Sequence, residues 1–298
     1  MRHFIVVIIL FRLITSLSSQ SYFKKYNNFP RGSESVSDII KIDSLFCIIT
    51  SSSEVENEET WKVTNRIIRN QTGEQVIKNF IQPNKSFSFS TECIIFNSQQ
   101  NLFGIGIRSI SNSLNWDYDI FLFEMDKSAN VKWTKSIGDS KIRESSKTVI
   151  QVDDGGYLIG GWRHKSPTSN LHEAFLLKTS ATGDSLWMKI FTNPELSNHS
   201  EGKVLVKGVN NTCYYFYKTD YSFNYAKLNA STGDVIWEKS YPVEGIQRSA
   251  VFSVLTDDDG RLIATGVFSD QNQGICTPVV WEIDADGNIM EEHLYNGL

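Results

Sequence analysis

The chain has 298 residues, of which 40% are hydrophobic, 12% aromatic and 21% charged, a composition that excludes a disordered, collagen-like or coiled-coil protein. A chain of this length buries about three-quarters of its unfolded surface, so it needs no disulfide or metal for stability. The formal net charge is −5, from 29 basic and 34 acidic residues, and the basic residues are scattered along the sequence. Because binding to a phosphate backbone needs a concentrated positive surface, we expect no nucleic-acid partner.

The N-terminus has the features of a secretory signal peptide. Arg2 supplies a positive start, residues 4–11 are all apolar, and small residues follow. The apolar run is shorter than the ~18 residues that a membrane-spanning helix needs, and no later stretch approaches that length. Arg12 departs from the signal-peptide pattern, and a short buried strand is the alternative interpretation. We expect residues 1–20 to be a signal peptide and residues 21–298 to be secreted or displayed at the cell surface, not spanning a membrane.

A short turn motif recurs at an almost constant interval. Its five copies are Thr72-Gly73-Glu74, Ser128-Ala129-Asn130, Thr182-Gly183-Asp184, Thr232-Gly233-Asp234 and Asp286-Gly287-Asn288. The central residues are 56, 54, 50 and 54 positions apart, and such a period is typical of a repeat architecture. Counted from turn to turn, the units are residues 21–74, 75–130, 131–184, 185–234 and 235–288, and residues 289–298 begin a further strand.

The residues after each turn repeat in register. Four positions after the turn centre lie Trp133, Trp187 and Trp237, with Ile77 and Glu291 at the matching places. Two positions further lie Lys135, Lys189 and Lys239. This alternation of apolar and polar residues is typical of a half-buried strand, and residues 22–26 resemble the same strand. We interpret the three tryptophans as packing residues between neighbouring units rather than as ligands of a cofactor.

Each unit is predicted to contain four short strands, which in the third unit are residues 132–137, 147–152, 157–162 and 174–179. A glycine turn joins the middle pair in the third and fifth units, as Asp153-Asp154-Gly155-Gly156 and Asp257-Asp258-Asp259-Gly260. These glycines supply the positive φ of a tight hairpin. The other units have Asp43-Ser44, Gln99-Gln100 and Asn210-Asn211 there, so we expect turns of a different type.

The pattern predicts an all-β fold. No 12-residue window has a helical apolar period, and Asn, Ser and Gly are frequent between the strand-like runs. Four antiparallel strands in repeated units of 50 to 56 residues indicate a β-propeller, in which each sheet is one blade. Residues 289–298 then either complete a ring of five blades or begin a further blade of a larger propeller. Because a chain that stops inside a strand leaves an open edge, we favour an incomplete, open ring.

Several motifs resemble those of known propellers. The segments 119–126, 154–161 and 186–191, together with the Thr-Gly-Asp turn, resemble blades of secreted propeller proteins of Bacteroidetes-type bacteria. That resemblance implies export as cargo of the type IX system. The segment 228–237 is similar to the tryptophan-docked repeats of quinoprotein dehydrogenase-like propellers. The dehydrogenases of that group carry adjacent cysteines beside the quinone, which this chain lacks, so the similarity implies the fold and does not extend to the quinone site.

The cysteines and histidines form no motif that indicates metal binding. Cys47, Cys93, Cys213 and Cys276 lie far apart, in or beside apolar runs, and we expect buried free thiols. His164 and His172 are assigned to one loop and are expected to be solvated. The run 257–259 lacks the spaced oxygen ligands of a calcium loop and is expected to be a solvated turn.

Candidate ligand-binding residues lie in the connection after the third strand of each unit, which is rich in aromatic and charged side chains. They are Trp61, Trp116, Tyr118, Trp162, Arg163, His164 and Tyr221. Propeller loops on one face commonly form a binding surface, because a rigid scaffold displays them together. The alternative is that these rings have only a packing role at the edges of the blades.

The leading hypothesis is a non-enzymatic propeller that binds carbohydrate or protein at the cell surface, as a monomer or as part of a longer exported chain. A purely structural scaffold is a variant of this hypothesis. The alternative is an enzyme with a site in the axial channel, either a quinoprotein-like oxidoreductase or a polysaccharide-cleaving enzyme. No catalytic residue and no cofactor is predicted.

Overall fold

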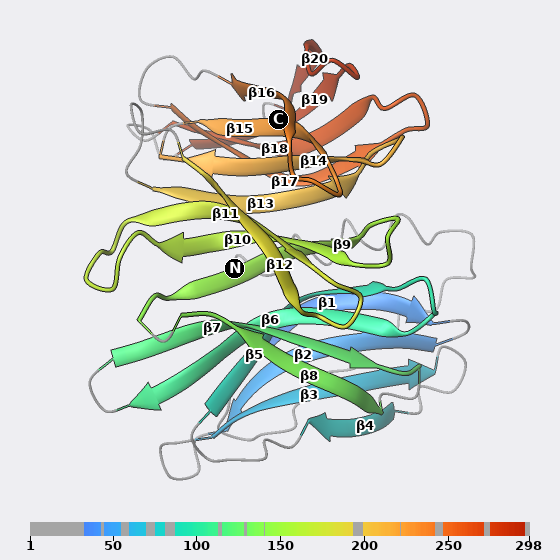
Figure 1. Ribbon diagram of the computed structural model, residues 1–298. Coiled ribbons are helices and arrows are strands. Elements are labelled where there is room, and N and C mark those ends of the chain that lie inside the picture. Colours follow the sequence, from blue (N-terminus) through green and yellow to red (C-terminus); the bar gives the residue numbers. More distant parts are fainter. Residues whose placement is uncertain are drawn as a thin grey trace. The chain divides into compact units, whose positions relative to one another are not determined.

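The computed structural model describes residues 33–42, 45–54, 60–69, 75–80, 87–112, 115–127, 130–139, 141–192, 199–220, 222–241, 247–270 and 275–295. Within these ranges every regular element is a strand, and the 20 strands form five antiparallel sheets of four (Figure 1). The all-β prediction is therefore confirmed. The same ranges contain no helix, and hence none with the length and apolar character needed to cross a bilayer.

The strands of each sheet are consecutive in the chain. The first sheet contains β1 (Ser33–Ile42), β2 (Leu45–Glu54), β3 (Thr60–Arg69) and β4 (Gln75–Phe80). The second contains β5 (Phe87–Phe96), β6 (Leu102–Asn112), β7 (Asn115–Met125) and β8 (Val131–Ile137). The third contains β9 (Glu144–Gln151), β10 (Tyr157–His164), β11 (His172–Thr179) and β12 (Ser185–Phe191). The fourth contains β13 (Ser200–Lys207), β14 (Thr212–Thr219), β15 (Phe223–Asn229) and β16 (Val235–Tyr241). The fifth contains β17 (Gln247–Thr256), β18 (Leu262–Asp270), β19 (Ile275–Ile283) and β20 (Ile289–Leu294).

Consecutive sheets pack against each other in the same way. The first strand of each later sheet contacts the first three strands of the sheet before it, so β9 lies against β5, β6 and β7, and β13 lies against β9, β10 and β11. Each sheet thus covers one face of its predecessor, as the blades of a propeller do.

The sheets are displaced by one strand from the repeat units counted in the sequence. The repeated turn joins the third and fourth strands of a sheet, so the unit 131–184 takes β8 from the second sheet and β9 to β11 from the third. The strand that was expected to begin a further unit, β20, is instead the fourth strand of the fifth sheet. The displacement arises because a periodic sequence specifies the interval but not the strand at which a sheet begins. Residues 22–26 lie outside the described residues.

Two of the three turns without glycine can be compared with those that have it. Gly155 and Gly260 have φ of 82° and 79°, as predicted. Gln100 has φ of 62° and its N–H donates to the carbonyl three residues before it, as that of Gly155 does. The prediction of a different turn is therefore wrong for the second unit, where a glutamine adopts the left-handed conformation. The fourth unit does differ, because Asn210 and Asn211 both have positive φ. Asp43-Ser44 lies outside the described residues.

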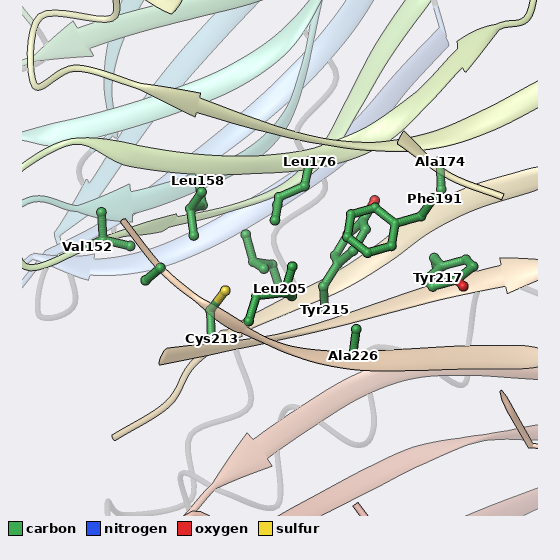
Figure 2. Close-up of a cluster of buried hydrophobic side chains, with 12 residues drawn as sticks. Val152, Leu158, Ala174, Leu176, Phe191, Leu205, Cys213, Tyr215, Tyr217 and Ala226 are labelled. Carbon is green, nitrogen blue, oxygen red and sulfur yellow. The ribbon is translucent and has the colours of Figure 1, made fainter. Parts of the chain in front are cut away.

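Side chains from the third and fourth sheets fill the space between them (Figure 2). The ring centroids of Phe191 and Tyr215 are 5.1 Å apart, and the Tyr215 hydroxyl donates to the carbonyl of Phe175 at 2.6 Å. The buried residues of this cluster are Val152, Leu158, Ala174, Leu176, Phe191, Leu205, Cys213, Tyr215, Tyr217, Ala226, Leu228 and Ala230. Similar clusters lie between the second and third sheets and between the fourth and fifth.

The cysteines only partly follow the prediction of buried thiols. Cys213 is a buried free thiol, and burial raises its pKa to about 12. Cys93 is half-buried, and Cys276 is exposed because it lies near the start of β19, beside a connection. The side chain of Cys47 lies outside the described residues.

Each repeated tryptophan lies over the turn glycine of the following sheet. A Cβ added to the glycine would lie within 3 Å of the ring, at 2.9 Å for Gly183 and Trp133, 2.7 Å for Gly233 and Trp187, and 2.7 Å for Gly287 and Trp237. The Trp187 indole N–H also donates to the carbonyl of Ser231 at 3.1 Å, and Lys189 donates to that of Gly233 at 2.9 Å. The prediction that the tryptophans pack between units is confirmed.

A double-mutant cycle tests this contact. Gly233→Ala should lower the free energy of unfolding by about 3 kcal/mol, because the new methyl group meets the Trp187 ring and the residue has positive φ. Gly155→Ala is the matched control with positive φ, where the new Cβ would meet only Ala181 Cβ at 3.8 Å, an ordinary van der Waals contact, and it should cost about 1 kcal/mol. In a Trp187→Ala background the cost of Gly233→Ala should fall to that of the control, as measured by urea unfolding. Equal costs in both backgrounds would contradict the docking contact.

A second substitution tests the left-handed glutamine. Gln100→Gly should raise the free energy of unfolding by about 0.5–1 kcal/mol, because relief of the strain at positive φ exceeds the entropy that glycine adds to the unfolded chain. Ser98→Gly, in the same exposed turn, should be destabilising. Thermal unfolding of both variants measures the difference, and a lower melting temperature for Gln100→Gly would refute the strain.

Candidate binding face at the second-to-third strand connections

The candidate residues lie at the same end of their sheets. Trp61 is near the start of β3, Trp116 and Tyr118 are near the start of β7, and Trp162 to His164 end β10. Because the strands are antiparallel, the second-to-third connections and the connections between sheets emerge at this common end, which we call the connection face. The strand displacement corrects the assignment of these residues to a third-to-fourth connection. Tyr221 lies outside the described residues, as do the side chains of Trp61 and Trp116.

Three rings stack on one side of the third sheet, and a fourth meets them edge-on. Trp162 stacks on His172 with centroids 4.3 Å apart and an interplanar angle of 14°. The His164 and His172 rings are 5.0 Å apart, and His199 meets His172 edge-on at 5.1 Å. His164 and His172 are directly opposite on β10 and β11, and Trp162 points to the same side because it is two residues from His164. We call these four residues the aromatic stack.

His164 is buried and His172 is half-buried, and both lie on strands, contrary to the expectation of solvated loop histidines. His164 is only 6% exposed, and burial lowers its pKa, reinforced by the charges of His172 and Arg143. Burial also lowers the pKa of His172, against the opposing charge of Glu201, whose Oε1 lies 3.6 Å from His172 Nδ1. The misassignment arose because β10 extends to His164, two residues beyond its predicted end. The continuing alternation of Trp162, Arg163 and His164 was the available sequence signal.

Arg163 points to the opposite side of the same strand and meets a buried carboxylate. Its Nε is 3.8 Å from Glu144 Oε1, on the residue directly across in β9. Asp119 of the second sheet lies close by, since a Cβ added to Gly138 would be 2.3 Å from Asp119 Oδ1 and 3.0 Å from Glu144 Oε2. Arg108 approaches Asp119 at 4.0 Å. We call Asp119 and Glu144 the carboxylate pair.

Burial dominates the chemistry of the carboxylate pair. Glu144 is 3% exposed, and desolvation raises its pKa to about 7, opposed by Arg163 and supported by the charges of Asp119 and Asp139. A hydrogen bond that the Asp139 backbone N–H donates to the Glu144 carboxylate lowers this pKa. Desolvation also raises the pKa of Asp119, opposed by Arg108. A carboxyl group that titrates near neutrality can carry a proton in acid–base chemistry. No sequence pattern marked this pair, because its members belong to different sheets.

Tyr118 is half-buried, and the Arg143 guanidinium lies 5.8 Å from the centre of its ring.

The run 257–259 is a turn, as predicted. The Asp257 carboxylate accepts hydrogen bonds from the backbone N–H of Asp259 and from the backbone and side chain of Arg261, so its oxygens are engaged within the turn.

Comparisons with known proteins identify the fold and no closer relationship. No protein-family model and no curated protein matches the sequence. A solved protein of unknown function from Dyadobacter fermentans is 8% identical with a TM-score of 0.56, over 90% of this chain and 88% of that one. The Dos1 propeller is 12% identical with a TM-score of 0.50, over 85% of this chain and 59% of that one. The polysaccharide lyase Uly1 is 10% identical with a TM-score of 0.54, over 82% of this chain and 56% of that one.

These similarities establish a propeller fold and leave the activity to be argued from the site. The chain spans less than two-thirds of the length of the Dos1 propeller and of Uly1. Because an enzyme is among the structural neighbours, the fold alone does not distinguish a binding protein from a catalyst.

Because the pKa of Glu144 is raised in the folded chain, we expect the stability of the wild type to depend on pH and Glu144→Gln to remove this contribution. Between pH 4.5 and about 7 the unfolded chain loses the Glu144 proton while the folded chain retains it, so the wild type loses stability as the pH rises. The difference in unfolding free energy, variant minus wild type, should therefore increase with pH in this range by at most about 1.4 kcal/mol per unit, and stay constant above it. Urea unfolding from pH 4 to 8 measures it, and a constant difference would refute the raised pKa.

Proposed function

We propose that this protein is a secreted or cell-surface, non-enzymatic binding module whose connection face binds a carbohydrate chain. The observation that carries the proposal is the aromatic stack, in which the Trp162 ring is held against His172 at the end of a rigid sheet. The apolar face of a sugar ring packs on an aromatic ring, and a ring already fixed by stacking loses little entropy on binding. Trp162 is partly exposed, so its ring remains accessible.

Polar groups around the stack suit a ligand with many hydroxyl groups. The pKa values of His164 and His172 are lowered, which favours neutral imidazoles that both donate and accept hydrogen bonds. Arg143 and Tyr118 extend the same end of the sheets. The net charge of −5 opposes a polyanionic ligand, so a neutral polysaccharide fits this surface better than nucleic acid.

Secretion is part of the proposal. The charged start and apolar run of residues 1–20 support export by a signal peptide, and the resemblance to exported bacterial propellers supports the same compartment. A polysaccharide at a cell surface is the ligand class that such a location makes available.

A second candidate function is polysaccharide cleavage, favoured specifically by the carboxylate pair. Glu144 has a pKa of about 7 and lies at the start of β9, whose backbone lies against three strands of the second sheet. Paired carboxyl groups with different proton affinities are the acid–base apparatus of many sugar-cleaving enzymes. Release of reducing ends or unsaturated products from a bound polysaccharide, abolished by Glu144→Gln, would replace the binding proposal with this one.

The binding proposal is tested with a panel of neutral polysaccharides and a glycan array. Trp162→Ala should weaken binding about 10-fold or more, because the stacking ring is lost, whereas Trp162→Phe should retain most of the affinity. Ile236→Ala, on the exposed outer strand β16, is the control and should bind as the wild type does. Thermal unfolding confirms that each variant is folded. Absence of glycan binding by the wild type, or equal binding by Trp162→Ala, would overturn the proposal.

A further inference from the structure

The outer strand of the fifth sheet departs from the repeat. In the second, third and fourth sheets this strand carries a tryptophan followed two residues later by a lysine, and both contact the next sheet. In β20 the same two positions hold Glu291 and His293. The residues that dock one sheet on another are thus replaced by two side chains that commonly ligate metal ions.

A third such side chain lies beside them on β19. Glu282 is directly opposite Glu291 in the strand register, and Glu291 and His293 point to the same side because they are two residues apart. His293 Nε2 is 3.1 Å from Glu291 Oε2 and 3.8 Å from Glu282 Oε1, and the three ligand atoms all lie within 4.8 Å of one another. Donors bound at 2.0–2.2 Å to a tetrahedral zinc ion are roughly 3.3–3.6 Å apart, so small side-chain rotations bring these three onto one ion.

The charges at this position also favour a cation. Two carboxylates directly opposite on adjacent strands repel each other. Among the described residues, the only basic side chain within ion-pair distance of either carboxylate is His293, which is within that distance of both. The nearby Glu292 points to the other side of the sheet, where it accepts hydrogen bonds from Trp281 and Tyr241. A divalent ion would therefore neutralise a pair that the sheet itself leaves without a full counter-charge.

We propose that Glu282, Glu291 and His293 form a binding site for a divalent transition-metal ion of the zinc type. One imidazole and two carboxylates are a donor set that zinc accepts, and water completes the tetrahedral coordination. The side chains are about half exposed, so the ion exchanges with solvent and its fourth position is open to a further ligand. Bound zinc joins β19 to β20 and stabilises the outer edge of the fifth sheet. This site is separate from the connection face and does not depend on the proposed carbohydrate ligand.

The experiment is calorimetric titration of the full chain, without a polyhistidine tag, with Zn²⁺ alone. The wild type should bind one ion per chain with a micromolar Kd, and its melting temperature should rise when zinc is added. His293→Gln and Glu291→Gln should each weaken binding at least 10-fold and remove the thermal shift. The matched control is Glu292→Gln, on the same strand and opposite side of the sheet, which should bind zinc as the wild type does.

Three outcomes would overturn the proposal. The first is the absence of saturable zinc binding by the folded wild type. The second is unchanged zinc affinity in both His293→Gln and Glu291→Gln. The third is loss of binding in His172→Gln with retention in His293→Gln, which would place the ion in the aromatic stack instead. Circular dichroism of each variant distinguishes a lost ligand from a lost fold, and Co²⁺ absorbance provides a second readout of coordination by the same residues.

Discussion

The contact between a tryptophan ring and a glycine turn is the constraint on which the succession of sheets depends. The ring of Trp187 occupies the space that a Cβ at position 233 would need, and residue 233 also has φ of 74°. Only glycine meets both conditions without strain. The two features that repeat in the sequence are therefore the two halves of one contact. Where Ile77 replaces the tryptophan, the sequence 52 residues later has Ala129 in place of glycine, as expected if the absence of the ring removes one of the two requirements for glycine.

The period of the sequence predicted the strands well and the sheets less well. Strands β8 to β11 appear close to the residues predicted for them, because alternation and turn residues are local properties. Which strand begins a sheet is decided by hydrogen bonding between strands, which a periodic sequence does not reveal. Gln100 shows a related limit, because backbone hydrogen bonding holds a non-glycine residue in a conformation that turn statistics assign to glycine.

The candidate site was predictable only where it follows strand alternation. Trp162, Arg163 and His164 could be selected by their position, but the partners that define their chemistry come from other strands and sheets. His172 reaches the stack through register, and Asp119 reaches Glu144 through the packing of the second sheet on the third. Consecutive residues of β10 therefore point toward different neighbouring sheets. Trp162 faces the fourth sheet with the stack, whereas Arg163 pairs with Glu144 toward the second. One strand thus links an aromatic surface on one side to a titratable carboxylate on the other.

The tryptophan and glycine of one turn belong to different junctions. Gly183 receives Trp133 from the preceding sheet, whereas Trp187, four residues later, reaches Gly233 in the following one. A gene segment that runs from one turn to the next therefore encodes both the glycine that contacts the preceding sheet and the tryptophan that contacts the following one. A duplicated copy of this segment forms the same tryptophan–glycine contact with both of its neighbours. The number of blades can therefore change during evolution by duplication of whole segments, without a new type of contact between sheets.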